Sequence, residues 1–105
     1  MQTNEYLSII EGMIFLAGDE GMTLKQIMAV LEISRKEARE YLKQLLDYYD
    51  QKPIKGFQIV NYGGCYKMVT LVKHEAYYAK MIKQNHLRLS KSALDHTDLS
   101  AEILP

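Results

Sequence analysis

The 105 residues of this chain are enough for one domain with a modest core, or for one domain with a short tail. Hydrophobic residues make up 48% and charged residues 25%, as in an ordinary soluble globular protein, and no apolar run is long enough to cross a membrane. The N-terminus lacks the basic region and apolar stretch of a signal peptide, and Cys65 has no second cysteine to pair with. We therefore expect a cytoplasmic protein without a membrane partner.

The formal net charge is zero, but the charges are distributed unevenly. Residues 1–52 carry six basic and nine acidic side chains, whereas residues 53–94 carry seven basic side chains and one acidic side chain. Residues 95–105 are acidic again, with three carboxylates. A basic middle segment favours an acidic partner, nucleic acid or protein, although a solvated lysine-rich surface is the simpler interpretation.

The first predicted helix covers about residues 5–17 and is unusually apolar. Its apolar side chains occupy more than one stripe of the helix surface, so this helix is either central in the core or covered partly by a second protein. The sequence Gly-Asp-Glu-Gly at residues 18–21 then ends the helical pattern as a turn. Its two acids would repel a phosphate group, which argues against a phosphate-binding loop.

Two further helices, at about residues 24–31 and 35–49, each begin with a capping box. Thr23 precedes Gln26 by three residues, and Ser34 precedes Glu37 by three. Both helices carry apolar residues at helical spacing, and Ile33 in the short turn between them is expected to plug the core. Together they form a helix-turn-helix.

After these helices the spacing of apolar residues changes from a period of 3.6 residues to a period of about 2 residues. Residues 57–62 and 66–71 are rich in β-branched and aromatic side chains and flank a glycine pair, which predicts a β-hairpin. A fourth helix is expected at about residues 74–84. Three helices followed by a hairpin predict a winged helix-turn-helix over residues 1–85, mainly α with a β-hairpin and therefore of the α+β class.

The helix-turn-helix raises the question of DNA binding, in which the second helix would offer its exposed side chains to base edges. That helix mixes four basic and four acidic exposed residues, and the acids would oppose contact with phosphates. The alternative remains a small winged-helix DNA-binding transcriptional regulator that uses the basic hairpin and the last helix. The candidate weak nucleic-acid contacts there are Lys67, Lys73, Lys80 and Lys83.

The tyrosines favour a protein-contact surface over sequence-specific DNA binding. The chain has eight tyrosines and no tryptophan. Adjacent tyrosines on a helix cannot both face one core, so at least one of each pair is expected to be partly exposed, and exposed tyrosine is enriched at protein interfaces. The extra apolar stripe of the first helix points to self-association as a homodimer. The candidate interface residues are Tyr6, Ile9, Met13, Leu16, Tyr48, Tyr77 and Tyr78.

Enzyme chemistry finds little support in the sequence. Cys65 and His74 could be imagined as a nucleophile and its base, but a cysteine beside hairpin glycines is far more often a turn or strand residue. The three histidines lack the spacing of metal ligands, and no second cysteine joins them. We expect no catalytic residue, no metal and no cofactor.

Three segments, in order, resemble the bacterial family of segregation and condensation protein B. Residues 10–27, IEGMIFLAGDEGMTLKQI, are similar to the N-terminal signature of that family. Residues 63–70, GGCYKMVT, look like its wing, and residues 88–94, RLSKSAL, look like the start of its second winged helix. The resemblance covers about residues 6–94.

This resemblance implies a non-enzymatic accessory subunit of a bacterial condensin-like complex, acting in chromosome condensation and partition during cell division. Proteins of the family have two winged-helix domains, form dimers and bind the kleisin, segregation and condensation protein A. The kleisin closes the ring of the structural-maintenance-of-chromosomes ATPase. The resemblance further implies a nucleoid-associated protein whose own contact with DNA is weak or indirect.

The sequence departs from the family pattern at two places. Cys65 stands where the family usually has a second wing glycine, and the tail DHTDLSAEILP replaces an expected apolar helix. A truncated chain and a shifted reading frame would both explain such a tail. We expect residues 86–105 to be a disordered linker followed by an incomplete start of the second winged helix.

Overall fold

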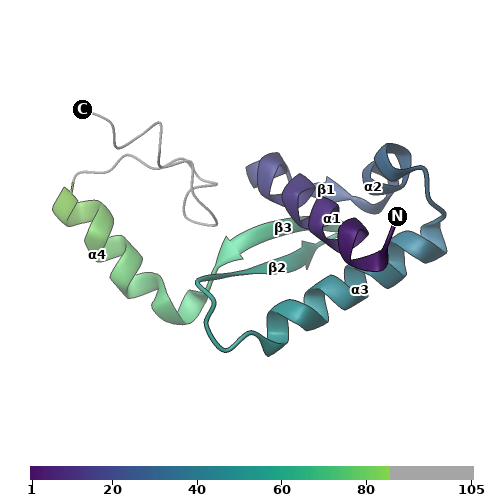
Figure 1. Ribbon diagram of the computed structural model, residues 1–105. Helices are drawn as coiled ribbons and strands as arrows, with labels where there is room; N and C mark the ends of the chain where they lie inside the picture. Colours follow the sequence, from purple (N-terminus) through teal and green to yellow (C-terminus); the bar gives the residue numbers. More distant parts are fainter. Residues whose placement is uncertain (86–105) are drawn as a thin grey trace.

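The computed structural model describes residues 1–85 and shows three α-helices packed with a small antiparallel sheet and a fourth α-helix that extends away from them (Figure 1). The expected linker and second-domain start, residues 86–105, lie outside the described residues. The order of elements confirms the predicted winged helix-turn-helix. The elements are α1 (Thr3–Ala17), the 3₁₀ turn η1 (Gly18–Glu20), β1 (Met22–Thr23), α2 (Leu24–Leu31), α3 (Arg35–Gln51), β2 (Phe57–Tyr62), β3 (Cys65–Thr70), the 3₁₀ turn η2 (Val72–His74) and α4 (Glu75–Asn85).

Both capping boxes of the helix-turn-helix are present. The Thr23 hydroxyl accepts from the Gln26 amide at 3.2 Å, and the Gln26 side chain accepts from the Thr23 amide at 2.9 Å. Ser34 and Glu37 make the equivalent pair at 3.1 and 3.0 Å. These reciprocal bonds satisfy backbone amides that an uncapped first turn would leave free, so the starts of α2 and α3 are fixed by local sequence.

The sheet has the strand order β1-β3-β2, with antiparallel pairing throughout. In the predicted hairpin, Phe57 pairs with Thr70 and Tyr62 with Cys65. The third strand, β1, was not predicted, and it places Thr23 opposite Cys65. It approaches β3 closely because Gly21 has a φ of +67°, and a Cβ there would lie 2.7 Å from the Tyr66 carbonyl oxygen.

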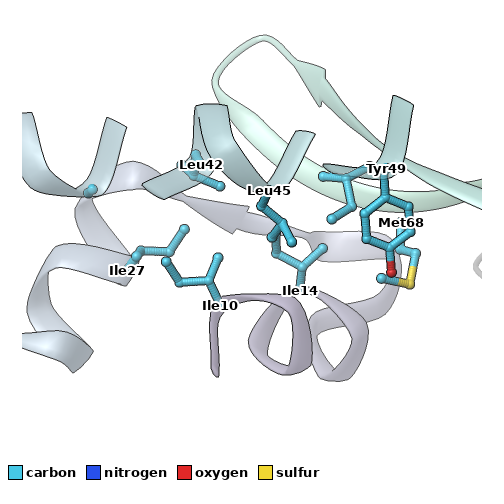
Figure 2. Close-up of a cluster of buried hydrophobic side chains, with 9 residues drawn as sticks. Ile10, Ile14, Ile27, Leu42, Leu45, Tyr49 and Met68 are labelled. Carbon is cyan, nitrogen blue, oxygen red and sulfur yellow. The ribbon is translucent and has the colours of Figure 1, made fainter. Parts of the chain in front are cut away.

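The core lies where α1, α2 and α3 meet one face of the hairpin (Figure 2). α1 buries Ile10 and Ile14 in it and leaves Ile9, Phe15 and Leu16 exposed, so this core covers only part of the apolar surface of α1. As expected, Ile33 packs against this core from the turn between α2 and α3. The buried cluster consists of Ile10, Ile14, Ile27, Ala38, Leu42, Leu45, Tyr49, Ile59 and Met68.

α4 differs from the other helices because it extends away from the rest of the described chain (Figure 1). None of its side chains that the structure describes, residues 75–84, is buried. Its closest packing is with the preceding turn η2, where His74 meets Tyr78 edge-on at 6.4 Å between ring centres. No helix within residues 1–85 is both long enough and apolar enough to cross a membrane.

Candidate protein interface and basic face

α1 presents two exposed faces on either side of its buried stripe. Residues three and four apart share one face of a helix, so the predicted α1 residues form one line, here named the outer strip: Tyr6, Ile9, Met13 and Leu16. Leu16 is 83% exposed and Ile9 is also exposed. Tyr6 and Met13 are half-buried, because Tyr6 stacks on Tyr41 at 4.7 Å and Met13 packs against the core.

The other exposed face of α1 borders a groove, here named the α1 groove. It consists of two hollows of about 350 and 280 Å³, and both are lined by Ser8 and Glu11. Aromatic side chains are partly exposed along it, among them Phe15 at 45%. Lining residues of the first hollow are Asn4, Leu7, Ser8, Glu11, Leu45, Tyr48 and Lys52. Those of the second are Ser8, Glu11, Gly12, Phe15, Tyr49, Phe57 and Met68.

Tyr49 connects the α1 groove to the core. Its side chain is 2% exposed, and its hydroxyl donates a hydrogen bond to the Glu11 carboxylate. Burial first, and then the hydrogen bond and negative charge of Glu11, raise the pKa of Tyr49 above its ordinary value. The Lys52 ammonium lies 4.7 Å from the centre of the same ring, within cation–π range. The groove therefore combines apolar walls with a fixed acid and a base at its edge.

The predicted interface residues do not form one surface. The four on α1 make the outer strip, whereas Tyr48 lines the α1 groove. Tyr77, which is 73% exposed, and Tyr78 lie on α4, away from both. The sequence interpretation missed Phe15 and Phe57, although the spacing of Phe15 four residues after Glu11, on a polar face, could have indicated an exposed aromatic.

A second feature, not predicted, is a concentration of cations around the start of α3. A hollow of about 340 Å³ lies between α2, α3 and the hairpin, and its lining includes Lys25, Arg35 and Arg39. A neighbouring hollow of about 500 Å³ also contains Arg35 and Arg39. We name as the basic face the five cations that line these hollows: Lys25, Arg35, Lys36, Arg39 and Lys43.

The four lysines predicted as weak nucleic-acid contacts lie elsewhere. Lys73 is in η2, and Lys80 and Lys83 are on α4. Lys67 is on β3 with its ammonium 5.3 Å from the Tyr62 ring. Side chains alternate along a strand, so Lys67 points to the sheet face opposite the one that Tyr66 presents to the hollow. The structure therefore separates these lysines from the basic face.

The residues weighed for catalysis have structural contacts. The Cys65 thiol donates to the Glu20 carbonyl oxygen at 2.8 Å, which joins the wing to η1. His74 packs against Tyr78 rather than pairing with the thiol. Within residues 1–85, no group of three or more His, Cys, Asp or Glu side chains is arranged to hold a metal ion.

Comparison with known proteins identifies the family. The family described as segregation and condensation complex subunit ScpB matches residues 8–97, most of the chain. The chain belongs to the ScpB family. This confirms the resemblance seen in the three sequence segments, and the family is non-catalytic, in agreement with the expectation of no enzyme.

Relatives in Bacillus agree with this assignment. Segregation and condensation protein B of Bacillus cereus (strain B4264) is 38% identical over 96 residues, which are 90% of this chain and 50% of that protein. The protein of the same name in Bacillus anthracis (strain CDC 684) is similar to the same extent. This ScpB-family chain thus spans about half the length of the curated relatives it matches.

Two solved structures share the fold. One is a dimer of the ScpB N-terminal domain complexed with an ScpA peptide, with a TM-score of 0.69 and 36% sequence identity. The match covers 74% of this chain and 95% of that chain. The other, ScpB from Mycobacterium tuberculosis, has a TM-score of 0.72 at 18% identity and covers 90% of this chain and 58% of that one, which supports the fold alone.

Proposed function

We propose that this ScpB-family chain is a non-enzymatic accessory subunit of a bacterial condensin-like complex, which dimerises and binds the kleisin ScpA. Through the kleisin it would act with the structural-maintenance-of-chromosomes ATPase in chromosome condensation and partition, as a cytoplasmic, nucleoid-associated protein. One observation carries the proposal. The chain is 36% identical to an N-terminal domain that forms a dimer complexed with an ScpA peptide, and it covers 95% of that domain.

The two exposed faces of α1 suit these two tasks differently. The outer strip exposes aliphatic side chains, Ile9 and Leu16, and a second copy of the same strip would cover them. The α1 groove is concave and lined by aromatic side chains, with Glu11 and Lys52 to fix the orientation of a bound segment. We therefore assign dimer formation to the outer strip and kleisin binding to the groove.

In this proposal residues 1–85 are the winged-helix domain, and residues 86–105 are a linker and the beginning of a second one. The family match extends to residue 97, beyond the end of α4. Tyr77 and Tyr78 on α4 would then contribute to contacts between domains or subunits rather than to the outer strip.

Three variants, each with a glutamate on a different surface, test this assignment. Leu16→Glu is expected to convert the dimer to a monomer, measured by light scattering, because it puts a charge into the apolar outer strip. Phe15→Glu, the neighbouring residue on the groove side, is expected to keep the dimer mass but weaken binding of purified kleisin by about tenfold or more, measured by calorimetry. Val30→Glu, 62% exposed on α2, is the matched control and should change neither.

Two results would contradict the proposal. A monomeric mass for the unsubstituted chain at the highest accessible concentration would remove the dimer. Undetectable heat with the kleisin of the same bacterium, from a chain that is folded by circular dichroism, would remove kleisin binding by this half of the protein.

A further inference from the structure

The cations of the basic face are concentrated without matching acids. Among residues 1–85, Lys25, Arg35, Lys36 and Arg39 form no ion pair, and Lys43 pairs with Asp47 at 3.8 Å. The lining of the two hollows contains one acid, Glu40. Unpaired cations this close together repel one another, so they create a local positive potential that an anionic partner would relieve.

The other acids of α3 offset only part of this potential. The Glu37 carboxylate keeps its charge, but the capping box holds it against the Ser34 amide at 3.0 Å and it lines neither hollow. Asp47 and Asp50 lie in the C-terminal half of α3, at least two turns beyond Arg39. Residues 35–43 therefore carry four bases and two acids, an excess of positive charge that the equal count along the whole of α3 conceals.

We propose that the basic face binds the phosphate backbone of double-stranded DNA without reading its sequence. Arg35 and Lys43 are eight residues apart on α3, which places their Cα atoms about 12 Å apart along the helix axis, the width of a B-DNA major groove. In a helix-turn-helix this half of the second helix approaches the groove, while flanking elements contact the backbone. Here Lys25 of α2 and Asn61 of the hairpin flank it in the same hollow.

DNA fits this surface better than an acidic protein segment does. Protein partners need aromatic or aliphatic anchors that become buried in the interface. The exposed large apolar side chains of residues 1–85 are absent from the lining of both hollows. The apolar side chains in the lining, Leu24 and Tyr66, are half-buried, so the exposed part of this surface is mainly arginine and lysine. Such a surface is typical of phosphate contact, in which affinity comes from the release of counterions.

A fluorescence-anisotropy titration of the 105-residue chain with labelled duplexes tests the proposal. With about four phosphate contacts, the slope of log affinity against log salt should be roughly −3.6, so affinity falls by about 100-fold between 50 and 200 mM salt. Two duplexes of unrelated sequence should bind equally within about threefold, because backbone contacts carry no sequence information.

Matched charge reversals locate the site. Arg35→Glu with Arg39→Glu should weaken binding at least tenfold at low salt and reduce the slope by about two units. Lys80→Glu with Lys83→Glu, the same charge change on α4, should leave more than half of the affinity. Both pairs lie on exposed helix positions, and circular dichroism checks that each variant is folded.

Three results would overturn the proposal. The first is a larger loss from the α4 pair than from the α3 pair. The second is a preference of more than tenfold for one sequence, which would indicate base reading. The third is equal competition by polyglutamate at the same charge concentration, which would indicate a general anion surface. None of these measurements uses the kleisin, so their outcome does not decide whether the chain dimerises and binds the kleisin.

Discussion

The two halves of α3 expose opposite chemistries although they belong to one continuous helix. The N-terminal half carries Arg35 and Arg39 beside the hairpin. The C-terminal half carries the exposed Tyr48 and the buried Leu45 and Tyr49 at the α1 groove. The N-terminal end of a helix is partly positive, so cations there are unfavourable by about 0.3–1 kcal/mol each. The first half is therefore not optimised for helix stability, while the second half is built around the core.

The largest change in stability is expected from removing a buried side chain at the middle of α3, on which both halves pack. Leu42 is buried between them, and Leu42→Ala should lower the free energy of unfolding by about 3 kcal/mol, measured by urea denaturation. Lys43→Ala, at the next and exposed position, should change it by less than about 0.5 kcal/mol. Equal losses for the two variants would show that Leu42 is not part of the core.

The groove half can be tested through Tyr49, whose hydroxyl donates to Glu11. Tyr49→Phe should cost about 1.5–3 kcal/mol at neutral pH, because a hydrogen bond to a charged acceptor is lost while the ring remains. The same variant isolates a pH effect. The raised pKa of Tyr49 means that its stabilisation is present below the ordinary value near 10.

Above pH 10 the unfolded chain releases the Tyr49 proton while the folded chain keeps it, so the stabilisation is lost as pH rises towards the folded-state pKa. The difference in unfolding free energy between the unsubstituted chain and Tyr49→Phe should therefore shrink between pH 9 and 11. Denaturation curves of both proteins at each pH measure it, and the other tyrosines cancel in the difference. A constant difference over this range would contradict the assigned pKa direction.

The basic half depends on its capping box. Ser34→Ala should cost about 1 kcal/mol of stability, because the Glu37 amide loses its partner. The backbone amide of residue 34, which holds the Glu37 carboxylate, remains in this variant, so DNA binding should be nearly unchanged. Glu37→Gln keeps an acceptor for the Ser34 amide and serves as the control, with stability nearly unchanged by thermal denaturation and DNA binding no weaker.

The smallest change in stability is expected for a variant that should alter stability and DNA binding in opposite directions. Arg35→Glu should raise the free energy of unfolding by about 0.5 kcal/mol, because it places an acid in the first turn of α3. The same variant should weaken DNA binding, measured by anisotropy. A variant that becomes less stable would show that Arg35 has a structural role, and one that binds DNA normally would remove it from the basic face.

Most of the fold could be predicted from sequence because its signals are local. The capping boxes define the starts of α2 and α3, and the bounds of α2 and β2 agree with the prediction. The strand β1 was missed since two residues carry no periodicity, and its pairing with β3 depends on a contact across more than forty residues. The α3 helix extends to Gln51, two residues beyond the prediction, which is an ordinary uncertainty for helix ends.

The candidate surfaces were predicted less completely. The sequence named four candidate residues on α1, which lie along one line in the structure. It could not show that Tyr48 lies at a different side of α1, because that depends on how α3 crosses α1. Charge counting over α3 also failed to find the basic face. The count ignored that Asp47 and Asp50 occupy the far end of the helix and that Glu37 lines neither hollow.

Thr23 belongs to two structures at once, since it pairs with Cys65 in the sheet and caps α2 with its hydroxyl. The wing therefore cannot swing as an independent flap, because any displacement of β3 pulls on the first residue of the helix-turn-helix. Thr23 therefore joins the hairpin side of the hollow to the helix side. A displacement of the wing would move the start of α2 with it. The width of the hollow between the hairpin and the helices would therefore stay nearly constant when a partner binds.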